Sequence, residues 1–389
     1  MNPIFISYSR SRIDRATLVD SLLDHGLNPW RDVESQEVGD ATTEVIEDQL
    51  STCSAAILWI NQDLLTSDYV ATVEIPAIAR AWKKGGLRIV PVFDGMTATE
   101  ASDKISSLTG VEIGNMNGHH INGDLSPEDN AAEIARRLMR AHVHDARRRG
   151  DPPIVRLVSY DDTAGLREQA VLNFDWRHRF SSGALQRSAE DRLRASMSAA
   201  AGALKDAYGS CEVTVAVKAH LPLAVALGHA FNQPTGCTLR LHRHDAEAWM
   251  TEPFDLGDHA LQRDESALGP VDTRVASVEV SITRDVVAGV NAYVSQGNRY
   301  RHRWTFTPER GPGRDTVDGS QMANHWAQQI ATALTTLADR HDIDRVDLFL
   351  AAPVEVAILV GWWANAVGSV DLMNWDSKAG PYLRIWSLP

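Results

Sequence analysis

The chain has 389 residues, of which 44% are hydrophobic, and a formal net charge of −13 at pH 7. This length and apolar content favour two or three folded domains and exclude a disordered or fibrous chain. The negative charge argues against a protein that coats duplex nucleic acid, because that mode needs a basic surface. The sequence shows no secretory leader and no apolar stretch of about 20 residues, so we expect a cytoplasmic protein without membrane contact.

The first third of the chain alternates between patterns typical of strands and of helices. Its order is strand 3–9, helix 12–26, strand 27–32, helix 42–53, strand 55–60, helix 74–84 and strand 87–93. This rhythm predicts an α/β fold with a parallel sheet that helices cover on both faces. Ligands of such sheets bind at the carboxyl ends of the strands.

A domain boundary is predicted in the segment Ala131–Pro153. An amphipathic helix runs there into a basic cluster, and Gly150, Pro152 and Pro153 then break it. We interpret the cluster as a solvated helix end, where cations suit the helix dipole, rather than as a nucleic-acid contact. The predicted domains are therefore residues 1–145 and 146–389.

An internal repeat follows the boundary. The segment Glu212–Asp245 aligns without gaps on Arg345–Lys378, at an offset of 133 residues (345 − 212 = 133). Each copy reads as an apolar strand, a tight turn, an apolar helix and a second strand, which is a Rossmann-like half. Two such halves related by a pseudo-twofold axis offer one composite face at their strand ends, which indicates a ligand-binding module.

The cysteines and histidines do not indicate a metal site. Cys53, Cys211 and Cys237 are far apart and form no CxxC pair, so neither a disulfide framework nor a zinc site is predicted. The segment His242–Asp245 has no second ligand cluster at metal spacing. We predict no metal and no bound cofactor.

Four motifs in the first 130 residues resemble those of a TIR domain. They are FISYSR, WRDVESQEVG, SDYVATVEIPAI and RIVPVFDG, in the family's order and spacing. The resemblance implies a flavodoxin-like domain with a parallel sheet. WRDVESQEVG resembles the segment with which NAD-cleaving TIR domains enter their BB loop.

Glu74 takes the position of the family's catalytic glutamate under this resemblance. A carboxylate beside the ribose can stabilise the oxocarbenium-like centre that forms when the nicotinamide–ribose bond breaks. Nicotinamide is already a cationic leaving group, so no general acid is needed. By its local pattern alone, Glu74 is a first-turn charge of a helix, which the helix dipole favours.

The other predicted substrate contacts follow from the same resemblance. Trp30 matches an aromatic residue that stacks on nicotinamide, and Arg10 matches a basic position near the phosphates. Asp32 and Gly39 are expected to shape the BB loop, and the pocket should open where the first strand ends. The predicted substrate-binding residues are Ser7, Tyr8, Arg10, Trp30, Asp32, Gly39 and Tyr69.

One position departs from the TIR pattern. The family usually has a tryptophan four residues before the glutamate, where this chain has Val70. The nearest aromatic residue, Tyr69, is five residues before Glu74. Either the helix begins one residue later, or Tyr69 takes the tryptophan's place.

The second half of the chain, residues 155–389, resembles a SAVED domain, a fusion of two CARF-like units that senses cyclic oligonucleotides. The resemblance rests on the duplicated unit and on the ending VDLFLAAPVEVAILVGWWAN…YLRIW. Cyclic nucleotides need donors for their phosphates and flat groups for their bases. The predicted contacts at the strand ends are Lys218, His220, His242, Arg284, Asn374 and Trp375.

The combination resembles the TIR–SAVED effectors of bacterial CBASS antiphage immunity. It implies an NAD+ glycohydrolase that a cyclic oligonucleotide, expected to be cyclic tri-adenylate, activates by driving self-association into a head-to-tail filament. NAD+ is then a substrate rather than a cofactor. A non-catalytic TIR adaptor and an enzyme that makes cyclic ADP-ribose are the alternatives.

Overall fold

The structure of the chain is a computed structural model. It describes residues 2–7, 15–30, 42–161, 163, 165–181, 183–210, 212–243, 246–251, 260–267, 272–365, 367–376 and 380–388. The chain divides into two compact units. Unit 1 comprises residues 1–146 with 171–174, and unit 2 comprises residues 147–170 with 175–389.

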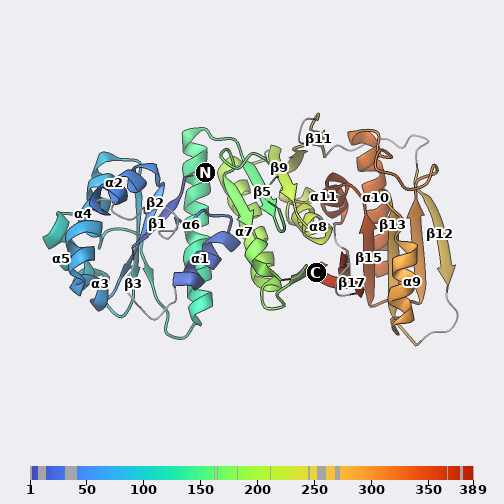
Figure 1. Ribbon diagram of the computed structural model, residues 1–389, viewed down its shortest axis with the longest axis horizontal. Coiled ribbons are helices and arrows are strands. Elements are labelled where there is room, and N and C mark those ends of the chain that lie inside the picture. Colours follow the sequence, from blue (N-terminus) through green and yellow to red (C-terminus); the bar gives the residue numbers. More distant parts are fainter. Residues whose placement is uncertain are drawn as a thin grey trace. The chain divides into compact units, whose positions relative to one another are not determined.

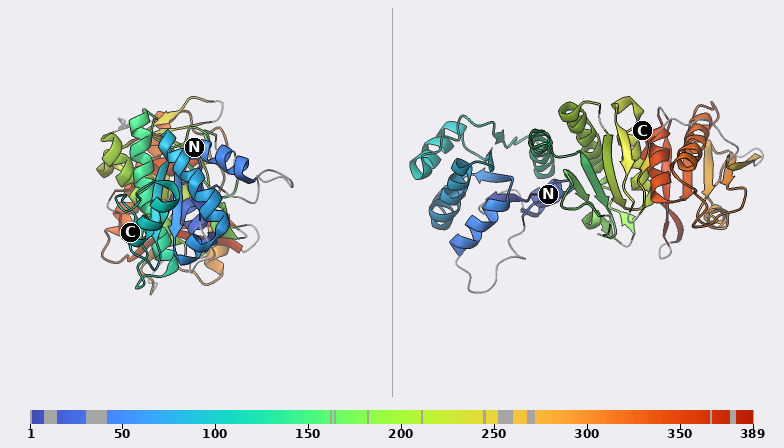
Figure 2. Two further views of the ribbon diagram at one scale, coloured as in Figure 1. Left: turned by 90° about the vertical axis from the view of Figure 1, so that its left-hand side faces the viewer. Right: turned by 90° about the horizontal axis from the view of Figure 1, so that it is seen from above.

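Unit 1 contains a parallel sheet with strand order β1-β2-β3-β4. Pro29 forms an isolated parallel bridge with Ile4 on the outer side of β1, which completes a flavodoxin-like order. Every residue of β1 and β2 is buried, as expected where helices cover both faces of a parallel sheet (Figures 1 and 2). The strands are β1 (Ile4–Ser7), β2 (Ala55–Ile60), β3 (Arg88–Phe93) and β4 (His119–His120).

The helices of unit 1 bury apolar faces against this sheet. Ile46 and Leu50 on one helix, and Ile75 and Ile78 on another, join Phe5 in one apolar cluster. The α-helices are α1 (Arg15–Asp24), α2 (Thr42–Thr52), α3 (Gln62–Thr66), α4 (Ile75–Lys84), α5 (Ala98–Thr109) and α6 (Pro127–Arg149), and a π-turn, η2 (Val70–Glu74), precedes α4.

Unit 2 contains two larger sheets. In the first, β10, β9 and β5 are parallel and β11 is antiparallel to β10. In the second, ordered β12-β14-β13-β15-β16-β17, the four inner strands are parallel and the two edge strands are antiparallel. The strands of unit 2 are β5 (Ile154–Val158), β7 (Phe180–Ser181), β8 (Ala184–Leu185), β9 (Glu212–Lys218), β10 (Thr238–Leu241), β11 (Trp249–Met250), β12 (Gln262–Ala267), β13 (Val275–Ser281), β14 (His302–Thr307), β15 (Arg345–Ala351), β16 (Val370–Asp376) and β17 (Gly380–Leu388). The strand β6 (Leu172–Asp175) falls in unit 1 except for Asp175.

The helices of unit 2 connect and cover these strands. They are α7 (Glu190–Tyr208), α8 (Leu221–Ala230), α9 (Val287–Ser295), α10 (Ser320–Ala338) and α11 (Val354–Trp363), with short 3-10 turns η3 (Arg177–Arg179) and η4 (Gln233–Thr235). The predicted α/β class, with a parallel first sheet and two Rossmann-like halves after it, is confirmed.

The predicted repeat matches the observed elements at the predicted offset. β9 starts at Glu212 and β15 at Arg345, while α8 starts at Leu221 and α11 at Val354. Both pairs have the same lengths and the same spacing. The gapless alignment of the two segments therefore describes two copies of one strand–helix unit.

Helices α8 and α11 lie side by side between the two larger sheets (Figure 1). A Cβ atom added at Gly228 would overlap the carbonyl oxygen of Ile358, and one added at Gly361 would overlap that of Val225. Gly361 and Ile358 occupy the same repeat positions as Gly228 and Val225. The two contacts are therefore reciprocal, as a pseudo-twofold axis between the halves requires.

A polar contact reinforces this helix pair. The Nδ1 atom of His229, on α8, lies at hydrogen-bonding distance, 2.9 Å, from the carbonyl oxygen of Ala364. Burial lowers the pKa of His229. A carbonyl oxygen can only accept, so the neutral ring carries its proton on Nδ1 and donates across the joint between the halves.

Replacement of Gly228 by Ala tests this packing. We expect a loss of about 1–3 kcal/mol in the free energy of unfolding, because the added methyl group meets backbone that cannot move aside. Gly202 is the control, since it also lies within a helix and a Cβ there meets nothing within 4 Å. Gly202→Ala should be neutral or stabilising. Equal stability of the two variants in urea unfolding would contradict the close approach of α8 and α11.

Candidate functional site

The carboxyl end of β1 holds a carboxylate in unit 1. Ser7 is the last residue of β1 and is fully buried. Its Oγ donates a hydrogen bond to Oε2 of Glu74, at 2.7 Å, and Glu74 itself is half-buried. A hydroxyl bonded to a carboxylate makes a short, strong hydrogen bond. Glu74 is thereby fixed at the edge of the parallel sheet where ligands of such folds bind.

Glu74 lies at the end of a π-turn and not in the first turn of its helix, so the first-turn interpretation was wrong. The chain is already helical at Asp68, and the N–H of Ile75 bonds to the carbonyl oxygen of Val70, five residues earlier. A π-turn contains one residue more than an α-turn, and such turns often occur at functional sites. Tyr69 therefore lies one turn before Glu74, which favours the interpretation that it takes the tryptophan's place.

The remaining predicted substrate contacts are partly described. Trp30 stacks on Phe5, with ring centroids 5.2 Å apart and an interplanar angle of 18°. Its backbone N–H donates to the carbonyl oxygen of Ile4, at 2.8 Å. One face of the indole is therefore used in packing against β1. Tyr69 is 41% exposed. Tyr8, Arg10, Asp32 and Gly39 lie outside the described residues.

In unit 2, the ends of β5 and β9 hold His220 in a fixed position. The backbone N–H of His220 donates to the Oγ atom of Ser159, at 2.9 Å, and the same Oγ lies 2.7 Å from Nδ1 of His220. One hydroxyl of Ser159 thus contacts both the backbone and the ring of His220, which fixes the orientation of the ring. Phe180 stacks on this ring at 4.5 Å, and Tyr160 meets it edge-on at 5.1 Å.

Two further predicted contacts lie at the same strand ends. Lys218 is the last residue of β9, and its carbonyl oxygen accepts the N–H of Ser159. His242 directly follows β10, and its ring packs against Gly165. The parallel strands β5, β9 and β10 end at one edge, so these residues share that edge with His220.

The second half places an arginine over an aromatic pair. The guanidinium carbon of Arg284 lies 5.8 Å from the centroid of Trp375, which is 40% exposed. Trp375 meets Tyr382 edge-on at 5.3 Å, and α9 packs directly on both rings at Gly289. Trp375 follows Asn374 on β16. The structure therefore brings Arg284 and Trp375 together, as a contact for a phosphate and a base would require.

An ion pair joins the strand ends of the two halves. Arg243 follows β10 in the first half, and Glu355 lies in the first turn of α11, after β15, in the second. Their Nε and Oε1 atoms are 3.5 Å apart. The carboxyl ends of β10 and β15 therefore border one composite face in unit 2, as the repeat predicted.

Sequence reasoning missed Ser159, Tyr160 and Arg243 at this face. Ser159 and Tyr160 come directly after the buried strand β5, and this position could have singled them out. Arg243 stands within the HRHD segment, of which only His242 was predicted as a ligand contact. Among the described residues, no group of three potential metal ligands is close enough to hold an ion.

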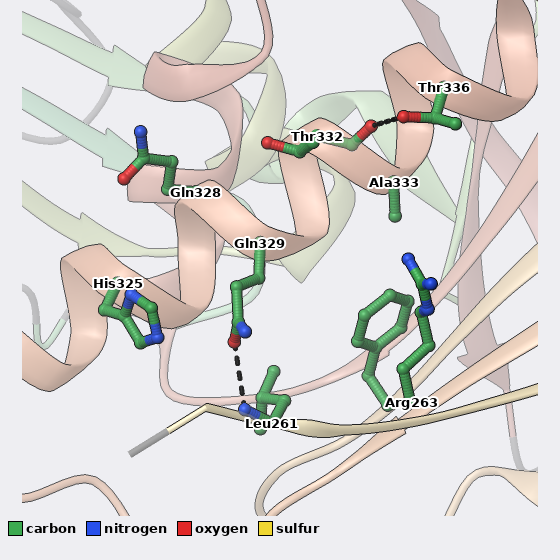
Figure 3. A pocket seen from close by; sticks show the side chains of 9 residues that line it. Leu261, Arg263, His325, Gln328, Gln329, Thr332, Ala333 and Thr336 are labelled. Carbon is green, nitrogen blue, oxygen red and sulfur yellow. Dashed lines mark hydrogen bonds between the residues drawn. The ribbon is translucent and has the colours of Figure 1, made fainter. Parts of the chain in front are cut away.

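Two cavities of unit 2 are lined by none of the predicted ligand-binding residues. One, of about 420 Å³, lies between α10 and the strands β12 and β14 (Figure 3). There the Oε1 atom of Gln329 accepts a hydrogen bond from the N–H of Leu261, at 2.9 Å. The other, of about 570 Å³, is bordered by α7, α8 and β17. No helix in the described ranges is long and apolar enough to cross a membrane.

Comparisons with known proteins match both parts of the chain. Residues 4–122 match the TIR domain family, and residues 197–388 match SAVED, described as an SMODS-associated sensor domain fused to various effectors. A search of curated proteins found no match.

Two solved structures are similar to most of the chain. The Cap4 SAVED/CARF-domain containing receptor of Acinetobacter baumannii, with the cyclic trinucleotide 2′3′3′-cAAA, is 11% identical over 98% of this chain and 99% of its own, with a TM-score of 0.50. The Cap4 receptor of Moraxella osloensis is 13% identical over 87% of this chain and 81% of its own, with a TM-score of 0.45. At such low identity, the likeness to the Acinetobacter protein shows a shared fold.

Replacement of Ser159 by Ala tests the construction of the composite face. It removes the acceptor for the N–H of His220, at a site where Ser159 is only 1% exposed. We expect the free energy of unfolding to fall by about 1–3 kcal/mol, the cost of an unsatisfied buried group. Thr163→Ala is the control, because this exposed hydroxyl donates only to Asp161. If both variants unfold at the same urea concentration, Ser159 does not hold His220.

Proposed function

We propose that this chain, which consists of a TIR domain fused to a SAVED sensor domain, hydrolyses NAD+ when a cyclic oligonucleotide binds its SAVED domain. The products would be nicotinamide and ADP-ribose. The observation that carries the catalytic half is the hydrogen bond between Ser7 and Glu74. It holds a carboxylate at the strand end of the TIR domain, and the resemblance of the sequence assigns this residue to the family's catalytic glutamate.

Cleavage of the nicotinamide–ribose bond needs few protein groups besides this carboxylate. Cleavage of the nicotinamide–ribose bond develops positive charge on the ribose, and a preorganised carboxylate stabilises that charge. The hydrogen bond from Ser7 fixes the Oε2 atom of the Glu74 carboxylate. Tyr69, one π-turn before Glu74 and well exposed, would supply a flat surface beside the nicotinamide ring.

The composite face of the SAVED domain supports a cyclic trinucleotide as the activator. The repeat pairs Lys218 with Ala351, His220 with Pro353, and His242 with Trp375. Paired positions of the two halves thus carry different side chains, and the composite face is not symmetric. A ring of three nucleotides has no twofold axis, so it suits this broken symmetry better than a ring of two or four.

A structural relative with a bound ligand also supports a cyclic trinucleotide as the activator. The Acinetobacter receptor was solved with a cyclic trinucleotide, 2′3′3′-cAAA, and it shares the fold of this chain. Cyclic tri-adenylate is therefore the activator that we propose.

Ligand binding would activate the TIR domain through self-association. A ligand that binds the assembled form better than the free protomer drives assembly by mass action. The two faces of a pseudo-dimeric sensor differ, so head-to-tail contacts would build a filament rather than a closed dimer. Assembly would bring TIR domains together, and the resulting loss of NAD+ would arrest an infected cell, as in CBASS immunity.

The variant Glu74→Gln tests the catalytic assignment. We expect the ligand-stimulated release of nicotinamide to fall at least about 100-fold, the effect of removing a charge that stabilises the transition state. The amide oxygen can still accept from Ser7, so the fold and ligand-driven assembly should persist. Nicotinamide release by chromatography and particle size by light scattering measure the two outcomes.

Glu47→Gln is the matched control for this experiment. Glu47 lies in the same domain and forms an exposed ion pair with Arg80, at 2.6 Å. Exposed pairs contribute little to stability, so this variant should keep full activity. Full activity in Glu74→Gln would overturn the assignment.

A further inference from the structure

Arg243 lies at the composite face, where its N–H groups donate no hydrogen bond to another described residue. Its guanidinium carbon lies 4.3 Å from the ring centroid of Trp249, and its side chain is one-third exposed. The Nε atom is 3.5 Å from Oε1 of Glu355, outside hydrogen-bonding geometry. Within the described ranges, Arg243 has this ion pair and the contact with Trp249, and it makes no hydrogen bond.

This arrangement is suited to a phosphate. A guanidinium group has five N–H donors in a rigid fork that matches two oxygens of a phosphate. Stacking on Trp249, which is 5% exposed, holds the plane of the fork without using any donor. The side chain is therefore oriented before it has bound anything through its N–H groups.

The start of α11 adds a second feature to the same place. Glu355 lies in the first turn of this 10-residue helix, and no side chain caps its N-terminus. The first N–H groups of a helix have no partner within the helix and favour anions. The ion pair with Glu355 therefore brings Arg243 beside a helix end that can also donate to a phosphate.

We propose that Arg243 and the N-terminus of α11 bind one phosphodiester of the cyclic oligonucleotide, and that Glu355 competes with this phosphate for Arg243. The inference rests on the proposed sensing function. Before ligand binds, Glu355 holds the guanidinium in place at 3.5 Å. When ligand binds, the two negative groups repel each other, and the phosphate gains the hydrogen bonds that Glu355 does not make. Glu355 thus weakens ligand binding.

Calorimetric titration of the full chain with 2′3′3′- and 3′3′3′-cyclic tri-adenylate tests the proposal. Arg243→Ala should raise the Kd at least about tenfold, the effect of losing charged hydrogen bonds. Arg243→Lys should have a Kd between those of the unchanged protein and of Arg243→Ala, because lysine keeps the positive charge but lacks the forked set of N–H donors. Glu355→Gln should lower the Kd about threefold or more, because it removes the competing charge.

Arg240→Ala is the control. Arg240 lies on β10 close to Arg243, but it is exposed and pairs with Glu212 at 3.7 Å. This variant should bind as the unchanged protein does. Thermal unfolding of each variant shows whether it is folded, and Arg243→Lys and Glu355→Gln test the proposal even if Arg243→Ala does not fold.

The results distinguish a failure of this proposal from a failure of the proposed sensing function. If Glu355→Gln weakens binding as Arg243→Ala does, the pair only joins the two halves and the proposal is wrong. It is also wrong if Arg243→Ala binds as tightly as Arg240→Ala. If the unchanged protein binds neither cyclic tri-adenylate, the sensing function proposed for this ligand fails, and the role of Arg243 fails with it.

Discussion

The close contact of α8 and α11 at Gly228 and Gly361 sets the geometry of the SAVED domain. Because neither glycine has a side chain, each helix meets the backbone of the other, and the two sheets are held at a fixed separation. Each helix follows directly after a strand, β9 or β15, so the contact also fixes where those strands end. The composite face, with Lys218 and His220 on one half, depends on this joint. A change in the packing of the two helices would therefore move every candidate ligand contact.

The sequence predicted this architecture well because a gapless repeat shows which residues of the two copies occupy equivalent positions in the fold. The gapless offset between Glu212 and Arg345 predicted two copies of one strand–helix unit, and β9 and β15 start at these two residues. The motif FISYSR likewise predicted a first strand with Ser7 at the pocket, and Ser7, the last residue of β1, is hydrogen-bonded to Glu74. Such features are local or repeated, so a single sequence contains them.

Other features of the sites arise only when distant segments meet. The π-turn before Glu74 depends on one hydrogen bond, from Ile75 to Val70, and ordinary helix spacing gives no signal for it. Arg243 and Glu355 are separated by more than 100 residues, and their ion pair exists because the two halves join. Stacking of Trp30 on Phe5 also follows from tertiary packing rather than from its motif. These contacts determine the position and orientation of the side chains at the two candidate sites.

The central claim is that ligand binding at the composite face of the SAVED domain turns on NAD+ cleavage at Glu74 of the TIR domain. The most direct test follows NAD+ consumption and particle size together for the purified chain, with cyclic di-, tri- and tetranucleotides and with no ligand. The account predicts rapid nicotinamide release and growth in size with a cyclic trinucleotide, and neither without ligand. Growth in size with unchanged NAD+ would contradict it and would indicate a TIR adaptor that recruits partners without chemistry.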